Sequence, residues 1–181
     1  LTLDGGVTNS ANPGNALTEA GTTGEAVSTI IAGGNGADLI VSSGVLTGMA
    51  DATATAVGAS FNVSVSNDAD VSAGAALSNG SSIATTMVSG IGSGDGTDMI
   101  INSGPVDLDA SAIALGVQVG LDVAGSVTGD MASGGALSVT RTQAETSAIG
   151  IASGSDTDEI LNTALIDVDS QSSATGFSGN Y

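Results

Sequence analysis

The sequence predicts an all-β fold, a β-solenoid of the β-helix or β-roll type that is built from three repeats of 60 residues. The first observation is a column of identical residues at that spacing, Asp38, Asp98 and Asp158, with no insertion between the copies. A fixed spacing of this kind is the signature of an array of stacked equivalent units. The second observation is the alternation of apolar and polar residues, and the third is the frequent Gly, which disfavours helices.

The three repeats are expected to form one continuous array. Its units span residues 1–60, 61–120 and 121–180. Tyr181 falls in the column of Leu1, Phe61 and Leu121, so it is expected to begin a fourth repeat. We expect Phe61 and Leu121 to be buried at junctions between repeats. Leu1 and Tyr181 should be buried by neighbouring protein, through end-to-end self-association or continuation of the same chain.

Within each repeat the expected elements follow a fixed order. The segment 61–66 alternates apolar and polar residues, which predicts a strand with one buried face. The segment that begins with Gly74-x-Ala76-Leu77 has mixed Ser, Thr and Ala, and we expect turns and short strands there. A glycine-rich turn at 33–36 leads into a strand at 38–41, and alternate alanines at 50–56 predict a further strand.

The length of the repeat bears on how the strands are stacked. Sixty residues are too many for one ordinary solenoid coil, so we expect two or three coils in each repeat, each rising by ~4.8 Å. The alternative is one unit resembling a β-sandwich in each repeat, with the units strung as beads.

The composition excludes most catalytic chemistry. The chain has one basic residue, Arg141, and no Lys, His, Cys or Trp, so it cannot form a nucleophile–His pair, a Schiff base or a His/Cys metal site. We therefore expect no enzymatic activity. A net charge of −18 repels nucleic-acid phosphates and anionic lipid surfaces, and no apolar stretch approaches the ~20 residues of a membrane-spanning helix. Neither nucleic acid nor a membrane is an expected partner.

The composition also bears on folding and on compartment. Hydrophobic residues make up 41% of the chain, which favours a narrow core of small side chains over disorder. Because Cys is absent, stability has to come from backbone ladders and stacking, to which bound metal ions would add. A chain rich in Gly, Ala, Ser and Thr, with one cleavage point for trypsin-like proteases, is typical of a long-lived extracellular polymer. The predicted location is extracellular or at the cell surface.

One motif carries recognisable chemistry. The run Gly33-Gly-Asn-Gly-Ala-Asp-Leu-Ile-Val41 matches the nonapeptide G-G-x-G-x-D-x-U-x, where U is a large aliphatic residue. It resembles the calcium-binding nonapeptides of RTX-type secreted bacterial proteins. The resemblance implies that Asp38, and with it Asp98 and Asp158, binds Ca²⁺ while Ile40 points into the core. The chemistry is reasonable because Ca²⁺ takes six to eight oxygen ligands and glycines allow several carbonyls to face one point.

Further candidate ligands lie in the same turns. They are Asn35 in the first copy, Asp95 in the second and Asp156 in the third. RTX nonapeptides occur in tandem, whereas here one nonapeptide recurs every 60 residues, so an ion shared between neighbouring turns is not implied. The alternative is a purely structural turn, in which Asp38 accepts hydrogen bonds from turn amides and Ile40 anchors the strand.

Two other polar patterns recur. Asp107 with Asp109, and Asp167 with Asp169, place two carboxylates on one strand face about 7 Å apart. They indicate a solvated acidic face, with a cation site or the acid and base of a β-helical glycosidase as alternatives. Asn102 and Asn162, with Ser42 in the first copy, are candidates for a polar ladder along the stack or for turn residues.

The wider repeat pattern is also similar to that of giant secreted surface proteins and adhesins of Gram-negative bacteria. Together these features predict a structural protein that forms an extracellular filament, stalk or adhesin shaft, stiffened by backbone ladders and by Ca²⁺, in contact with a cell surface or matrix. The alternative function is a calcium-dependent adhesive binding module of a secreted surface protein. A polysaccharide-active β-helix is a more remote alternative, because the chain has few aromatic residues with which to bind sugars.

Overall fold

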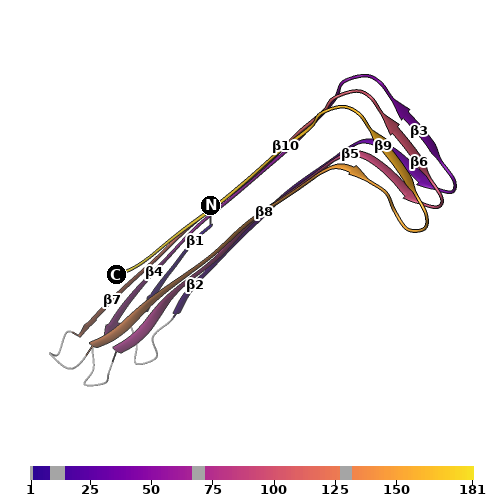
Figure 1. Ribbon diagram of the computed structural model, residues 1–181. Coiled ribbons are helices and arrows are strands. Elements are labelled where there is room, and N and C mark those ends of the chain that lie inside the picture. The colour runs from indigo at the N-terminus through magenta and orange to yellow at the C-terminus, as the bar shows by residue number, and fades with distance from the viewer. Residues whose placement is uncertain (1, 9–14, 67–71, 127–131) are drawn as a thin grey trace.

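A computed structural model describes residues 2–8, 15–66, 72–126 and 132–181 (Figure 1). These residues form ten strands and no helix. The strands are β1 Thr2–Thr8, β2 Asn15–Asn35, β3 Leu39–Ser42, β4 Leu46–Ser66, β5 Ser72–Asp95, β6 Met99–Asn102, β7 Val106–Ser126, β8 Ala132–Ala152, β9 Glu159–Asn162 and β10 Ile166–Asn180. The described part of the chain thus has no helix that is long and apolar enough to cross a membrane.

The strands form three parallel sheets that are stacked in chain order. Sheet A has the order β1-β4-β7-β10, sheet B the order β2-β5-β8 and sheet C the order β3-β6-β9. Sheets A and B form two long layers that face each other, and sheet C joins them at one end (Figure 1). The prediction of an all-β fold is confirmed, and the stacked parallel sheets are consistent with a β-solenoid.

The register shows that one repeat forms one coil, defined here as a long strand, a short strand and a second long strand. In sheets B and C, and between β4, β7 and β10 in sheet A, paired residues are 60 positions apart, as in Leu17↔Leu77 and Ile40↔Ile100. The expectation of two or three coils per repeat is therefore wrong. The bead arrangement is also wrong, because every described sheet pairs strands from successive repeats.

The reason lies in the length of the strands. The central third of the repeat, where we expected turns and short strands, belongs to continuous strands of 21 to 24 residues in β2, β5 and β8. Glycines such as Gly24 and Gly80 lie inside these strands, where an added Cβ would meet the opposite layer. Gly here permits a close approach between two layers, and it does not mark a turn.

The first strand departs from the register of 60. β1 pairs with β4 at a spacing of 56, so that Gly5 lies opposite Phe61. The prediction that the copies are in phase from the first residue is therefore wrong for β1, and Leu1 itself lies outside the described residues. A shift of four positions is even, so it leaves each side chain of a strand on the same face. The alternation of apolar and polar residues alone does not distinguish between the two registers.

The space between sheets A and B is filled by small side chains whose chemistry changes along the strands. Next to sheet C the core contains Leu108, Val106 and Val88. Further along, it consists of alanines, among them Ala54 and Ala114. In the half that lies away from sheet C, called the distal half below, Ala16 and Ala76 are buried, but most of the fully buried side chains are polar. These polar side chains include Ser60, Asn62, Ser64, Ser78 and Gln118.

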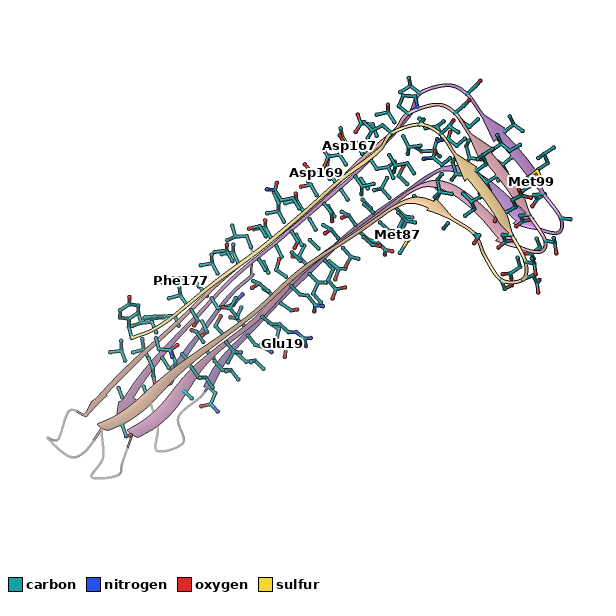
Figure 2. The ribbon with its side chains drawn as sticks, viewed as in Figure 1. Glu19, Met87, Met99, Asp167, Asp169 and Phe177 are labelled. Atoms are coloured by element: carbon teal, nitrogen blue, oxygen red, sulfur yellow. The ribbon has the colours of Figure 1, made fainter. Side chains whose placement is uncertain are left out.

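The outer faces of the two layers carry the remaining side chains. Asp167, Asp169 and Phe177 project outward from sheet A, and Glu19 and Met87 project outward from sheet B (Figure 2). Phe61, which we expected to be buried at a repeat junction, lies on the outer face of sheet A and is 38% exposed, while Asn62 and Ser64 face inward. That prediction is wrong because alternation identifies two faces of a strand without showing which one is inside.

Candidate functional site at the glycine and aspartate turns

The predicted metal ligands lie in or beside the turns between the long strands and sheet C, with Asn35 and Asp95 as the last residues of β2 and β5. Four glycines in the first two coils have positive φ, namely Gly34 (106°), Gly36 (124°), Gly94 (90°) and Gly96 (137°). The third coil has Asp156 in the column of Gly36 and Gly96, with φ of 86°. Non-Gly residues rarely adopt this region, although Asp tolerates it better than most. The positive φ is thus retained at this column although the glycine is lost, whereas Gly154, in the column of Gly34 and Gly94, is not among the residues with positive φ.

The three motif aspartates are brought together in one row, as the repeat predicts. The backbone N–H of Asp38 donates to Oδ1 of Asp98 at 2.8 Å. In the next pair, the N–H of Asp98 donates to Oδ1 of Asp158 at 3.0 Å. The carboxylates of Asp98 and Asp158 therefore each accept a hydrogen bond from the preceding coil, and the side chains form a ladder parallel to the backbone ladder. Asp98 and Asp158 thus accept from a backbone amide, as in the structural-turn interpretation, but the donor belongs to the neighbouring coil.

The second carboxylate oxygen of these residues has a different environment. Asp98 is 3% exposed, and Oδ2 of both Asp38 and Asp98 is buried without a hydrogen-bond partner in the structure. A Cβ at Gly33 would lie 2.8 Å from Oδ2 of Asp38 and would overlap the carbonyl oxygen of Ser93. A carboxylate oxygen and a carbonyl oxygen thus border the space beside Gly33. Oxygen donors of these two types are those that Ca²⁺ prefers.

The other predicted ligands do not converge on that space. Asn35 and Asp95 are exposed and adjacent in sheet B, and Oδ1 of Asp95 accepts a hydrogen bond from Ser155 at 2.9 Å. Asp156 is also exposed. Among the described residues no group of three or more acidic side chains is arranged to hold a metal ion.

A shallow groove of about 370 Å³ runs across the stack beside the aspartate row. It is lined in each coil by three consecutive residues, for example Thr97, Asp98 and Met99. The lining changes from Leu39 through Met99 to Glu159, so the groove becomes more acidic toward the third coil. Its repeated lining is a consequence of stacking, since each coil contributes the same three positions.

The asparagine column forms the expected ladder. Nδ2 of Asn102 donates to Oδ1 of Asn162 and to the carbonyl oxygen of Gly104, both at 2.8 Å. Asn162 repeats the second bond with the carbonyl oxygen of Ala164. In the first coil the column holds Ser42, and Oδ1 of Asn102 is buried without a partner. The first coil therefore lacks the asparagine that would donate to Oδ1 of Asn102 and continue the ladder.

The two Asp-x-Asp pairs lie on the outer face of sheet A. The two carboxylates of each pair share one strand face, as predicted. Asp107 pairs in register with Asp167, and Asp109 pairs with Asp169. All four side chains are exposed. The corresponding positions of the first coil are Thr47 and Met49. The arrangement matches a solvated acidic face.

Sequence reasoning missed a buried polar group in the distal half. Gln118 is fully buried, its Oε1 accepts a hydrogen bond from Ser78 at 2.6 Å, and its Nε2 has no partner in the structure. Its side chain fills the space left by Gly58 and Gly80, where a Cβ would overlap it. Nearby, Nδ2 of Asn62 donates to Asp122 at 3.1 Å. The sequence feature that could have identified this buried group is the occurrence of polar residues at alternate positions beside glycines.

Comparison with known proteins does not assign this chain to a family. No protein-family model, no curated protein and no solved structure matches this chain.

Proposed function

We propose that the chain is a β-solenoid unit of an extracellular structural array, which extends by adding coils end to end. The observation that supports this proposal is the continuous register, in which strands 60 residues apart pair in all three sheets. Each coil presents the same set of backbone donors and acceptors to the next. A surface of this kind is a template for further pairing with another coil.

The bonds between coils also indicate how two copies would join. The N–H of Asp158 is in the position from which Asp98 donates to the next coil, and Oδ1 of Asp38 is in the position that accepts. A head-to-tail contact between two copies can therefore repeat the bond that already links coils within one chain. Such a contact is heterologous and does not close, so it generates a filament.

The dimensions of the coil define the filament. Each coil adds about 4.8 Å along the stack, while a strand of 21 residues spans roughly 70 Å across it. The proposed array is accordingly a broad ribbon with strands perpendicular to its long axis. It differs from a slender stalk, because length along the axis grows slowly with the number of residues.

Electron microscopy and fibre diffraction of the purified chain test this function. We expect ribbons roughly 70 Å wide with a reflection near 4.8 Å along the fibre axis. A tandem fusion of two copies in the 60-residue phase should form ribbons of the same width at lower concentration. If both proteins stay as isolated particles at high concentration, or if the strands run along the fibre, the structural proposal is wrong.

The second candidate is a calcium-dependent adhesive module, which the unpartnered Oδ2 atoms of Asp38 and Asp98 favour. The carboxylates of the row and turn carbonyls such as that of Ser93 would hold the ion, which would neutralise closely stacked acidic groups. If it binds, Ca²⁺ should raise the melting temperature by mass action, since the site exists only in the folded chain.

The matched variant for this test is Asp98→Asn, which keeps the Oδ1 acceptor but removes the charge. Ca²⁺ should stabilise the original chain more than Mg²⁺ or Na⁺ does at equal ionic strength, and Asp98→Asn should lose that difference. Equal shifts from all three cations would leave a structural turn without an ion.

A further inference from the structure

The outer face of sheet A changes character along its strands. Next to sheet C it carries the exposed acidic rows of Asp107, Asp109, Asp167 and Asp169. Beyond these rows it becomes apolar: alternate residues of β7 from 113 to 123 are Ile, Leu, Val, Val, Leu and Val. Ile113 and Leu115 are 48% and 38% exposed in a central strand. We call this region the apolar patch.

The neighbouring strands extend the patch with aromatic residues. Phe61 in β4 is the register partner of Leu121, and Phe177 in β10 is the partner of Val117. Tyr181 follows β10, and its ring and that of Phe177 both lie close to Gly179. The chain has two Phe, one Tyr and no Trp. Every aromatic side chain of this protein therefore belongs to the apolar patch.

The patch reverses the usual relation between side-chain size and burial. Throughout the distal half, small or polar residues such as Ser60 and Gln118 fill the inside, while the larger aliphatic residues face outward. Next to sheet C the relation is normal, with Leu108 inside and Asp109 outside. Large contiguous apolar patches on soluble proteins mark interaction sites. The outer face of the distal half has the composition of a second core.

The geometry points to a second copy of this chain as the occupant, docked face to face through the apolar patch. The charge distribution selects the orientation. A two-fold axis along the strands would place the acidic rows of the two copies against each other, which like charges disfavour. A two-fold axis along the stacking direction makes the facing strands antiparallel, so the apolar patches overlap and the acidic rows project from opposite sides.

The large separation between the acidic rows of the two copies favours this orientation, although each copy has a net charge of −18. With the axis near Val117, the two copies of Asp109 would lie about 50 Å apart, eight residues from the axis on either side at ~3.3 Å per residue. The Debye length is about 8 Å at physiological ionic strength, so repulsion between the acidic rows is screened. Because the axis follows the stack, both ends of each stack stay free.

The size of the patch sets the expected strength. Across three strands it is apolar over residues 117–123 of β7 and their partners, about 23 Å by 14 Å or roughly 320 Å² on each copy, and Ile113 and Leu115 extend it in β7 alone. A specific interface needs about 1,000 Å² in total, so one pair of three-coil chains lies below that size. We expect a weak dimer, with the two sheets about 10 Å apart as in a β-sandwich. This interface does not rest on the filament function proposed above.

Sedimentation velocity over a concentration series tests the interface with two matched variants. Leu115→Lys places a charge in the patch, at a position where the neighbouring coils hold Thr55 and Thr175. Val139→Lys makes the same change of charge on the outer face of sheet B, where Val139 is 46% exposed. Leu115→Lys should raise the dimer dissociation constant by at least about tenfold, whereas Val139→Lys should leave it within about twofold.

Circular dichroism of both variants establishes that they keep the strand content of the original chain. A chain that is monomeric at all concentrations overturns the proposal, as does equal weakening by both variants. Open-ended oligomers that persist in Leu115→Lys would come from end-to-end pairing and concern the filament function alone.

Single cysteines test the orientation independently of affinity, since the chain has no Cys of its own. A short bismaleimide should cross-link Val117→Cys into dimers and should leave Asp109→Cys monomeric. Adding Leu115→Lys to the Val117→Cys chain should abolish the cross-link. Equal cross-linking at both positions, or at neither, contradicts the proposed two-fold arrangement.

Discussion

The two ends of the long layers are built by different means. At the end next to sheet C, aliphatic residues such as Leu108 fill the interior, and the aspartate and asparagine columns form ladders across the coils. In the distal half most of the interior side chains are polar, and Gln118 keeps a buried nitrogen without a partner. The same backbone pairing thus runs through two regions of very different side-chain support.

The difference indicates where the free energy of unfolding originates. Buried aliphatic side chains contribute roughly 1.5–3 kcal/mol each, whereas a buried polar group contributes little unless its hydrogen bonds are complete. The end next to sheet C should therefore be the more stable region of a single chain. The distal half depends more on its backbone ladder, and the proposed pairing of its outer face would supply the missing apolar burial.

The largest expected effect is at the turns of the end next to sheet C. Gly94 has positive φ, and a Cβ there would overlap the backbone carbonyl of Gly34 in the coil below. Gly94→Ala should lower the free energy of unfolding by at least about 3 kcal/mol, because strain and overlap add. Urea denaturation followed by circular dichroism measures the change.

Gly34→Ala is the matched control in the same column. Its φ is also positive, but no atom lies within 4 Å of the added Cβ. It should cost only about 1 kcal/mol. Equal costs for the two variants would mean that the coils are not in close backbone contact at this turn.

Truncation of one buried side chain in each region tests the comparison directly. Leu108→Ala should cost about 3 kcal/mol, because it empties part of a packed aliphatic core. Gln118→Ala should cost less than about 1.5 kcal/mol, because the loss of the bond to Ser78 is offset by removal of an unpartnered buried amide nitrogen. Urea midpoints of both variants give the two values. A Gln118 variant as costly as the Leu108 variant would show that the distal half is equally well supported.

The smallest expected effect is a gain at the asparagine ladder. Ser42→Asn supplies the missing rung, whose Nδ2 can donate to Oδ1 of Asn102. The completed bond should stabilise the chain by about 1 kcal/mol. Ser43→Asn, at the exposed neighbouring position, should leave the melting temperature unchanged. A Ser42→Asn chain that melts no higher than the original would show that the unpartnered oxygen is already satisfied by water.

The sequence by itself determined the period, the all-β class and the columns. Because stacked coils place residues 60 positions apart side by side, the alignment of Asp38 with Asp98 and of Asn102 with Asn162 follows from the repeat alone. The short strand predicted at 38–41 was also found, as β3 at Leu39–Ser42, because alternating residues have local conformational preferences. The predicted turn at 33–36 begins too early, since β2 continues to Asn35. The calcium role of the aspartates stays a prediction, since it depends on an ion and not on the column.

Only the tertiary structure decided how many coils a repeat makes and which face of each strand is inside. A glycine in a strand and a glycine in a turn look alike in sequence, so Gly24 and Gly80 gave no sign that one strand runs on for more than 20 residues. Alternation gave two faces to the segment around Phe61 without assigning either to the interior. That assignment depends on which side chains fit between the two layers: in the distal half the interior holds Ser60, Asn62 and Ser64, while Phe61 lies outside.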